Sequence, residues 1–173
     1  MRSLLLTALL LPSSFASASI IVARERHLRL FNTHTQERID VVFRRDGAYI
    51  PEALAKLDHF LRDHRTGMVK HYDPRLFDLL SDLVAKAGRP EDEISVICGY
   101  RTSVTNEFLR KRSRVSAVAK KSLHMLAEAI DIRLPGVRTS RLRDTALSLA
   151  RGGVGYYASS DFIHVDVGRV RRW

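Results

Sequence analysis

The chain has 173 residues, 45% of them hydrophobic, which predicts a single domain with a substantial core. Its formal net charge of +10 is typical of proteins that bind anionic polymers, nucleic acids among them. The arginines and lysines are spread along the whole chain, however, which argues against a dedicated nucleic-acid surface. A single cysteine excludes an internal disulfide and therefore a small disulfide-stapled scaffold.

Residues 1–18 have the pattern of a secretory signal peptide. A basic start at Met1-Arg2 precedes an apolar run from Leu4 to Leu11, and Ala16-Ser-Ala18 supplies the small residues of a cleavage site. The apolar run is too short to span a bilayer as a helix. We therefore expect Sec-type export, a secreted or periplasmic location and no stable membrane insertion after cleavage. Export also separates the protein from nucleic acid, so no nucleic-acid partner is expected.

Residues 19–173 are predicted to form one domain, with a hairpin extension at 19–50 and a core at 51–173. Alternating or continuous apolar residues predict strands at 27–31, 39–43, 94–98, 129–134, 154–157 and 162–167. Apolar stripes with capping, proline and glycine signals predict helices at 51–64, 73–88, 103–110 and 140–151. Together these elements predict an α+β fold, a central antiparallel sheet with flanking helices.

Two of the expected strands are apolar on one face and polar on the other. Successive side chains of a strand point to opposite faces. In 129–134 the isoleucines on either side of Asp131 therefore share the core face, and Asp131 points away from the core. In 162–167, His164 and Asp166 share the face opposite the core for the same reason. Both strands thus carry potential metal ligands on one face.

Three side chains form a candidate set of zinc ligands: His124, Asp131 and His164. Two imidazoles and one carboxylate leave a fourth position for water, as hydrolytic zinc sites require. We expect one Zn²⁺ per chain, which would activate water and polarise a scissile carbonyl. A further carboxylate must accept the proton of the water. Asp161, at the turn before the last strand, is the favoured candidate, and Asp166 is the alternative, although it can instead orient a ligand imidazole.

A second polar segment, Cys98-Gly-Tyr-Arg-Thr102, follows the strand at 94–98. The guanidinium of Arg101 donates two hydrogen bonds, which suits an oxyanion or a substrate carboxylate, although an ordinary salt bridge is the alternative. Cys98 is most simply a packing residue. The candidate substrate-binding residues of the whole chain are Tyr100, Arg101, Asn106 and Ser122.

An ordered set of motifs resembles a known family over His27 to Trp173. The motifs are Leu61-Arg-Asp-His-Arg65, Asp73-Pro-Arg75, Gly99-Tyr-Arg-Thr102 with Asn106, Ser122-Leu-His-Met125, Ala129-Ile-Asp-Ile-Arg-Leu-Pro135, Gly152-Gly-Val-Gly155 and Phe162-Ile-His-Val-Asp166. The set resembles the zinc peptidases of the D-Ala-D-Ala carboxypeptidase and lysostaphin type, whose fold is also that of Hedgehog. Within that family it is similar to the secreted murein endopeptidase K branch.

This resemblance implies roles for the candidate residues. His124, Asp131 and His164 would bind zinc, Asp161 would be the acidic residue before the last histidine, and Arg101 would contact the substrate or the transition state. The implied substrate is peptidoglycan, cleaved at peptide cross-links that involve diaminopimelate. The chain departs from the family at Ala127, where glycine is usual, and at Cys98, where a small polar residue is usual.

Several functions stay open on the sequence alone. A zinc-dependent murein endopeptidase acting on peptide stems is the first hypothesis, and a carboxypeptidase that trims stem peptides uses the same chemistry. A non-catalytic peptidoglycan-binding module with a degenerate metal site is a third. A cysteine hydrolase that pairs Cys98 with His124 or His164 is a fourth, which needs an adjacent base and an accessible thiol.

Overall fold

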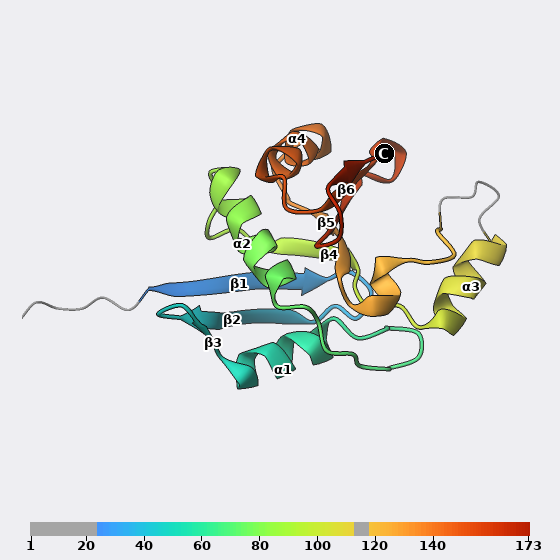
Figure 1. Ribbon diagram of the computed structural model, residues 1–173, viewed down its shortest axis with the longest axis horizontal. Helices are drawn as coiled ribbons and strands as arrows, with labels where there is room; N and C mark the ends of the chain where they lie inside the picture. Colours follow the sequence, from blue (N-terminus) through green and yellow to red (C-terminus); the bar gives the residue numbers. More distant parts are fainter. Residues whose placement is uncertain (1–23, 113–117) are drawn as a thin grey trace, which may run out of the picture.

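The computed structural model describes residues 24–112 and 118–173, so the expected signal peptide lies outside the described residues. In the described part, strands form one sheet in the order β3-β2-β1-β4-β5-β7-β6-β8 (Figure 1). The strands are β1 (Glu25–Asn32), β2 (Arg38–Arg45), β3 (Ala48–Tyr49), β4 (Ile94–Cys98), β5 (Ala129–Arg133), β6 (Gly153–Tyr157), β7 (Phe162–Asp166) and β8 (Arg171–Arg172). The α-helices are α1 (Pro51–Phe60), α2 (Arg75–Lys86), α3 (Ser103–Arg112) and α4 (Thr139–Leu149), and 3₁₀ helices cover Leu123–Leu126 and Ala158–Ser160.

The sheet is mixed, which confirms an α+β domain but shows that the prediction of an antiparallel sheet is wrong. β1 runs parallel to β4, and β6 runs parallel to β8. In the first parallel pair, β1 and β4 are separated in the chain by β2, β3, α1 and α2, so no tight hairpin turn forces them to be antiparallel. The expected N-terminal hairpin, β1–β2, is present and antiparallel, and β6 and β7 also form an antiparallel pair.

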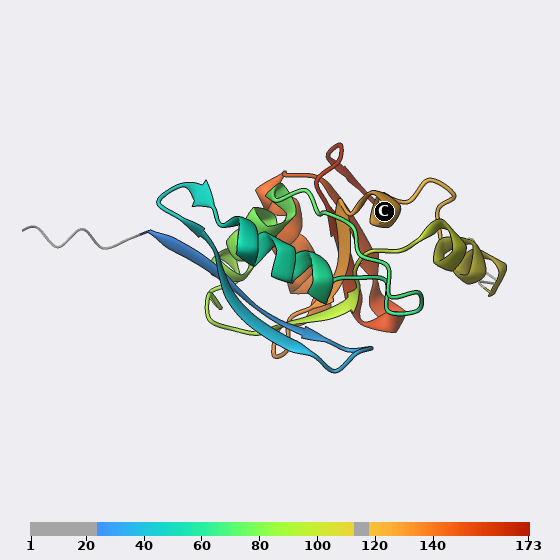
Figure 2. The same ribbon diagram turned by 90° about the horizontal axis from the view of Figure 1, so that it is seen from below.

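The hydrophobic core lies between the sheet and helices α1, α2 and α4, which Figure 2 shows grouped together while α3 lies apart from them. Ile130 and Ile132 of β5 and Ile163 of β7 are at most 1% exposed, as the alternation predicted. Burial of each such side chain contributes roughly 1.5–3 kcal/mol to stability. The opposite face of β5 and β7 is therefore fixed as the polar face. None of the helices in the described ranges is long and apolar enough to cross a membrane.

Helix α1 begins at Pro51, where the missing N–H is tolerated, and ends at Phe60, short of the predicted residue 64. The Asp63 carboxylate accepts a hydrogen bond from the Arg65 N–H at 3.0 Å, a local turn that competes with helical hydrogen bonding. Asp63 also accepts from the N–H and hydroxyl of Thr102, at 2.9 and 2.8 Å. This buried carboxylate therefore ties the turn after α1 to the segment that carries Arg101.

The same turn carries a histidine that should make stability depend on pH. Burial, together with the nearby His34 and Arg65, lowers the pKa of His64 from 6.5 to about 4, and its ring stacks on His34 at 3.9 Å. Between these pH values the His64 imidazole binds a proton in the unfolded chain but stays neutral in the folded chain. The free energy of unfolding therefore falls as the pH falls. Because solvent screens this partly exposed ring, we expect a loss of about 1 kcal/mol between pH 7 and pH 4.

Urea unfolding of the wild type and of His64→Gln at several pH values measures this effect. The glutamine variant should show a shallower decrease in unfolding free energy between pH 6.5 and pH 4, and the difference isolates His64 from the other histidines. Identical pH dependences in the two proteins would contradict the assignment.

Candidate metal centre

The polar face of the sheet brings four positions into one row across neighbouring strands. Cys98 of β4 pairs with Asp131 of β5, Asp131 pairs with His164 of β7, and His164 pairs with Gly155 of β6. Residues directly opposite each other on antiparallel strands have their side chains adjacent. The register therefore places the Asp131 carboxylate beside the His164 imidazole, although 32 residues separate them in the sequence.

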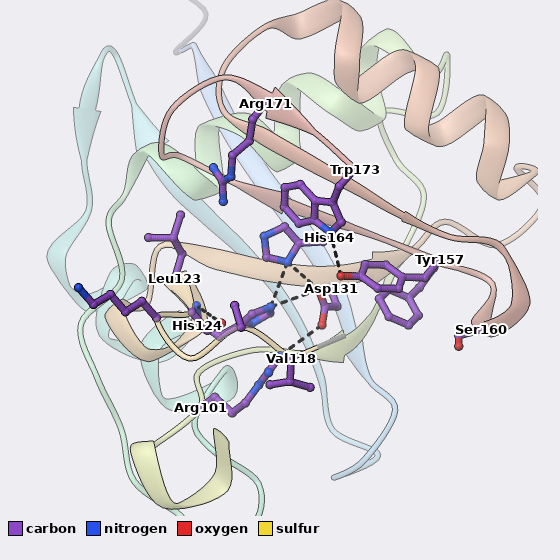
Figure 3. A pocket seen from close by; sticks show the side chains of 14 residues that line it. Arg101, Val118, Leu123, His124, Asp131, Tyr157, Ser160, His164, Arg171 and Trp173 are labelled. Carbon is purple, nitrogen blue, oxygen red and sulfur yellow. Dashed lines mark hydrogen bonds and ion pairs between the residues drawn. The ribbon is translucent and has the colours of Figure 1, made fainter. Parts of the chain in front are cut away.

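His124 reaches the same point from the 3₁₀ helix Leu123–Leu126. Its Nε2 atom lies 3.2 Å from Asp131 Oδ1 and 3.1 Å from His164 Nδ1, and the last two atoms are 2.9 Å apart (Figure 3). Ligand atoms about 2.0–2.1 Å from a tetrahedral zinc ion lie ~3.4 Å from one another. The three side chains thus converge with a spacing slightly tighter than that of a metal-binding set, and all three are buried.

The outer nitrogens of both imidazoles have acceptor partners, which fixes how the rings face the centre. Nδ1 of His124 lies 2.8 Å from the Gly99 carbonyl oxygen, and Nε2 of His164 lies 3.1 Å from Asp166 Oδ2. If the outer nitrogens carry the protons, the inner nitrogens direct lone pairs at each other and at the Asp131 carboxylate. Such an arrangement requires a cation at its centre.

The electrostatics of the triad agree with a site for positive charge. Burial alone would lower the pKa of His124, but the adjacent Asp131 carboxylate and the Cys98 thiol raise it to about 10. Burial alone would raise the pKa of Asp131, but His124 and His164 hold it well below its ordinary value. Either a proton or a metal ion can supply the positive charge that this cluster favours. The donor set of two imidazoles and one carboxylate suits zinc.

Asp166 lies behind His164 and is fully buried. Its carboxylate accepts from the N–H groups of Gly153 and Gly168, both at 2.9 Å, and from Arg171 at 2.7 Å. Burial alone would raise its pKa, but these donors and His164 lower the pKa of Asp166 to about 2. The carboxylate is therefore an anion that orients the imidazole, and it does not line the pocket in front of the triad.

Arg101 lies on the other side of Asp131 and is 7% exposed. Its NH2 atom is 3.6 Å from Asp131 Oδ2, and its NH1 atom donates to Asn106 Oδ1 at 3.3 Å. Asn106 in turn donates to the Ala119 carbonyl oxygen at 3.1 Å. Within the described residues, Arg101 Nε has no hydrogen-bond partner. Asn106 is thus a support for Arg101 and for the segment after α3, and it lies outside the pocket lining.

A pocket of about 300 Å³ opens in front of the triad. Five of the residues that the sequence singled out line it together: Arg101, Ser122, His124, Asp131 and His164. Tyr100, Asn106, Asp161 and Asp166 are not brought to its surface. Tyr100 packs against the hydrophobic core. Ser122 precedes the 3₁₀ helix, where its hydroxyl accepts from the His124 N–H at 3.4 Å.

The structure does not bring Asp161 to the triad. Its backbone is left-handed, with φ of 51°. Its carboxylate forms an ion pair with Arg133 at 3.0 Å and accepts a hydrogen bond from the Thr139 hydroxyl, while Arg133 Nε donates to the Asp161 carbonyl oxygen at 2.6 Å. The side chain is 61% exposed. In this conformation it is directed to the surface, while its neighbours Ser160 and Phe162 line the pocket.

Ala127 ends the 3₁₀ helix in the left-handed conformation, with φ of 56° and ψ of 40°. An L-residue there is less favourable than glycine by roughly 1–2 kcal/mol, which gives a physical reason for the family's glycine at this position. The alanine does not displace the triad, because the His124 carbonyl still accepts from Arg101 N–H at 3.2 Å and the three donor atoms converge.

Cys98 lies beside the triad, with its ligand atom and those of His124 and Asp131 within 4.8 Å of one another. Burial would raise the pKa of the thiol, but His124 and Arg101 lower it. The thiol is half-buried and does not line the pocket. A nucleophile must reach the substrate, so the geometry gives no support to a cysteine hydrolase.

Four residues with a place in this site were not identified from the sequence as site residues: Asp63, Tyr157, Arg171 and Trp173. Asp63 fixes the Arg101 segment, and the other three line the pocket. Asp63 lies in the Leu61–Arg65 motif, and this motif could have identified it from the sequence. Tyr157, Arg171 and Trp173 show no spacing pattern in the sequence. They reach the pocket through the pairing of β6 with β7 and β8 and through backbone hydrogen bonds of Trp173 to β6.

Two imidazoles and a carboxylate at the floor of a pocket, on the polar face of an α+β sheet, define the kind of centre that metal-dependent hydrolases use. Residues 21–173 match the protein family Peptidase_M15_2, described as peptidoglycan L,D-endopeptidase MepK, and the chain belongs to this peptidase family.

Named relatives agree with this family. The chain is 45% identical to peptidoglycan L,D-endopeptidase MepK of Escherichia coli K12 over 168 residues, which cover 97% of this chain and 90% of the relative. The Shigella flexneri protein of the same name gives the same values. A probable peptidoglycan L,D-endopeptidase MepK of Haemophilus influenzae is 42% identical over 164 residues, 95% of this chain and 87% of the relative.

Proposed function

We propose that the protein is a zinc-dependent murein endopeptidase that hydrolyses peptide cross-links of peptidoglycan in the periplasm. The observation that carries the proposal is the convergence of His124 Nε2, Asp131 Oδ1 and His164 Nδ1 within 3.2 Å of one another. The relatives' names supply the substrate class, since they are peptidoglycan L,D-endopeptidases. These three residues would hold a zinc ion, which when bound would supply Lewis acidity and lower the pKa of a water molecule.

The chain's own residues then bind and orient the substrate. Arg101, held by Asp131 and Asn106, places positive charge beside the pocket, and Lys121 and Arg171 add charge to its lining. Stem peptides carry free carboxylates, and such anions are attracted by this lining. Asp166 keeps the His164 ring and its protonated nitrogen in a fixed orientation, so that the other nitrogen faces the centre.

Asp161 is proposed as the proton acceptor after its side chain leaves Arg133 and Thr139. Its exposure permits that rotation, and the pocket begins at its neighbours Ser160 and Phe162. Asp161→Asn should lower the rate of hydrolysis by about 10²–10⁴-fold, the range for loss of a general base, with the metal content unchanged. Hydrolysis at the wild-type rate by a metal-loaded Asp161→Asn protein would show that another group accepts the proton of the water.

Digestion of purified sacculi tests the proposed function. The protein without residues 1–18 is incubated with sacculi, with added zinc or with a chelator, and the released muropeptides are identified by mass spectrometry. Zinc-dependent conversion of cross-linked dimers into monomers is the expected result. Release of single terminal amino acids would indicate a carboxypeptidase instead. Binding to sacculi with no release above a His124→Ala control would indicate a binding module.

A further inference from the structure

One wall of the pocket is aromatic and contacts the triad. Tyr157 ends β6 and stacks on Phe162 of β7, with ring centroids 4.6 Å apart. Trp173 packs against His164, with ring centroids 5.2 Å apart, and its indole N–H donates to the Tyr157 hydroxyl oxygen at 3.0 Å. Figure 3 shows Tyr157 and Trp173 on one side of the triad and Arg101 on another. The wall therefore connects a candidate ligand directly to a phenol.

The position of Trp173 is built into the fold. Gly155, the neighbour of His164 in the row across the sheet, has no side chain, and a Cβ there would approach the indole ring to 2.7 Å. The ring fills the space that this glycine leaves. Backbone hydrogen bonds between Trp173 and β6 (Tyr156 N–H to Trp173 at 3.1 Å and Trp173 N–H to Val154 at 3.3 Å) hold the residue in register, and the Arg171 guanidinium covers the ring at 5.0 Å.

The indole N–H determines where the Tyr157 hydroxyl hydrogen points. A phenol oxygen accepts on one side in the ring plane and donates on the other. With Trp173 on the accepting side, the O–H is directed to the other side, and accepting a hydrogen bond strengthens it as a donor. Across residues 24–112 and 118–173, the Tyr157 hydroxyl meets no acceptor, and Tyr157 lines the pocket.

The other prominent donor beside the triad, Arg101, is partly engaged. Its NH1 donates to Asn106 and its NH2 forms an ion pair with Asp131, while its Nε is buried with no hydrogen-bond partner in the described residues. A carbonyl oxygen that gains negative charge when water adds to it is stabilised by donors held in place before the reaction. Tyr157 is such a donor, because its ring is stacked on Phe162 and its oxygen is fixed by Trp173.

We propose that Tyr157 is a catalytic residue whose hydroxyl donates a hydrogen bond to the scissile carbonyl oxygen as charge develops there, and that Trp173 positions it. The proposal rests on the proposed hydrolytic function. Tyr157 stays neutral throughout and transfers no proton. Trp173 acts through Tyr157.

Tyr157→Phe tests the hydroxyl alone, because phenylalanine keeps the stacking on Phe162. We expect kcat on a purified cross-linked muropeptide dimer to fall about 10²-fold, with KM within threefold of the wild type and metal content unchanged. The matched control is Tyr156→Phe on the opposite face of β6, whose ring lies under Arg143. An unchanged kcat/KM, or a rise in KM with kcat unchanged, would overturn the catalytic role.

Trp173 supplies a readout that does not depend on turnover, since it is the only tryptophan of the chain. Its emission should change when Tyr157→Phe removes the acceptor of the indole N–H, and should not change in Tyr156→Phe. On rapid mixing of the zinc-loaded protein with the dimer, the emission should report equal affinity for wild type and Tyr157→Phe. Emission that is insensitive to Tyr157→Phe would show that the pair does not interact.

A double-mutant cycle tests the positioning role. Trp173→Phe keeps a ring near His164 but lacks the N–H, and it should lower kcat severalfold in the wild type yet have no further effect in Tyr157→Phe. Additive effects would show that Trp173 acts independently. If the wild type itself does not hydrolyse peptidoglycan, the proposed function fails. If the wild type is active and Tyr157→Phe equals it, only the present inference fails.

Discussion

Replacing His124 with alanine is expected to abolish zinc binding and peptidoglycan hydrolysis together. His124 Nε2 is one of the three converging donor atoms, so the variant retains only Asp131 and His164 as ligands. Removal of a hydrogen-bonding partner of a ligand typically weakens metal affinity about 10–100-fold, and removal of the ligand itself should exceed this. The backbone should remain intact, because the sheet holds the other two residues through the β5–β7 pairing.

Metal content after dialysis and muropeptide release measure this prediction, and circular dichroism checks the fold. The matched control is His59→Ala, which replaces an exposed histidine of α1. It should bind zinc and hydrolyse muropeptides as the wild type does. One equivalent of tightly bound zinc in His124→Ala would show that the metal binds at a site without His124, and would contradict the prediction.

Replacing Asp166 with alanine is expected to weaken both the fold and the metal centre. The carboxylate is fully buried and is bonded to His164, Arg171 and the N–H groups of Gly153 and Gly168. Breaking one partner out of a buried charged network typically costs about 3–5 kcal/mol of stability. Loss of the acceptor for His164 Nε2 should also lower zinc affinity roughly 10–100-fold.

The pH dependence of this loss has a defined sign. The pKa of Asp166 is lowered from 3.8 to about 2, so the carboxylate stabilises the fold above its ordinary pKa and this contribution is lost as the pH falls through about 2. The stability difference between wild type and Asp166→Ala should therefore be full at pH 6 and shrink toward pH 2. Denaturant unfolding at both pH values measures it, with the exposed Asp144→Ala as control. A difference below 1 kcal/mol at pH 6 would contradict the structural role.

The sequence predicts most elements of this fold because their patterns are local. Alternation in β5 and β7 correctly placed Ile130 and Ile163 in the core and the polar side chains opposite. Strand pairing is not local, so the parallel pairs β1–β4 and β6–β8 were missed. The end of α1 was misplaced because Asp63 accepts a hydrogen bond from the Arg65 N–H in a local turn and another from Thr102 in a tertiary contact, and the apolar pattern reveals neither.

The difference between local patterns and non-local pairing also explains which site residues the sequence revealed. Asp131 and His164 were identified because ligand residue types stand on the polar faces of two strands, and His124 because a third ligand type lies a few residues before Asp131 in the sequence. The structure places the three together. Asp161 sits in a left-handed turn whose direction no sequence pattern specifies, and its side chain turns to Arg133. Trp173 becomes a neighbour of His164, and Tyr157 a neighbour of Trp173, through the arrangement of the chain's last residues along β6 and the absence of a side chain at Gly155.

The proposed function requires a single metal ion, held by His124, Asp131 and His164, for the hydrolysis of peptidoglycan cross-links. Titration of metal-depleted protein with zinc, while cleavage of a purified cross-linked muropeptide dimer is followed, tests it most directly. We expect no cleavage without zinc, and a cleavage rate that rises linearly with added zinc until one equivalent per chain is bound. Full cleavage by the metal-depleted protein, or a cleavage rate that does not change with added zinc, would contradict the proposed function.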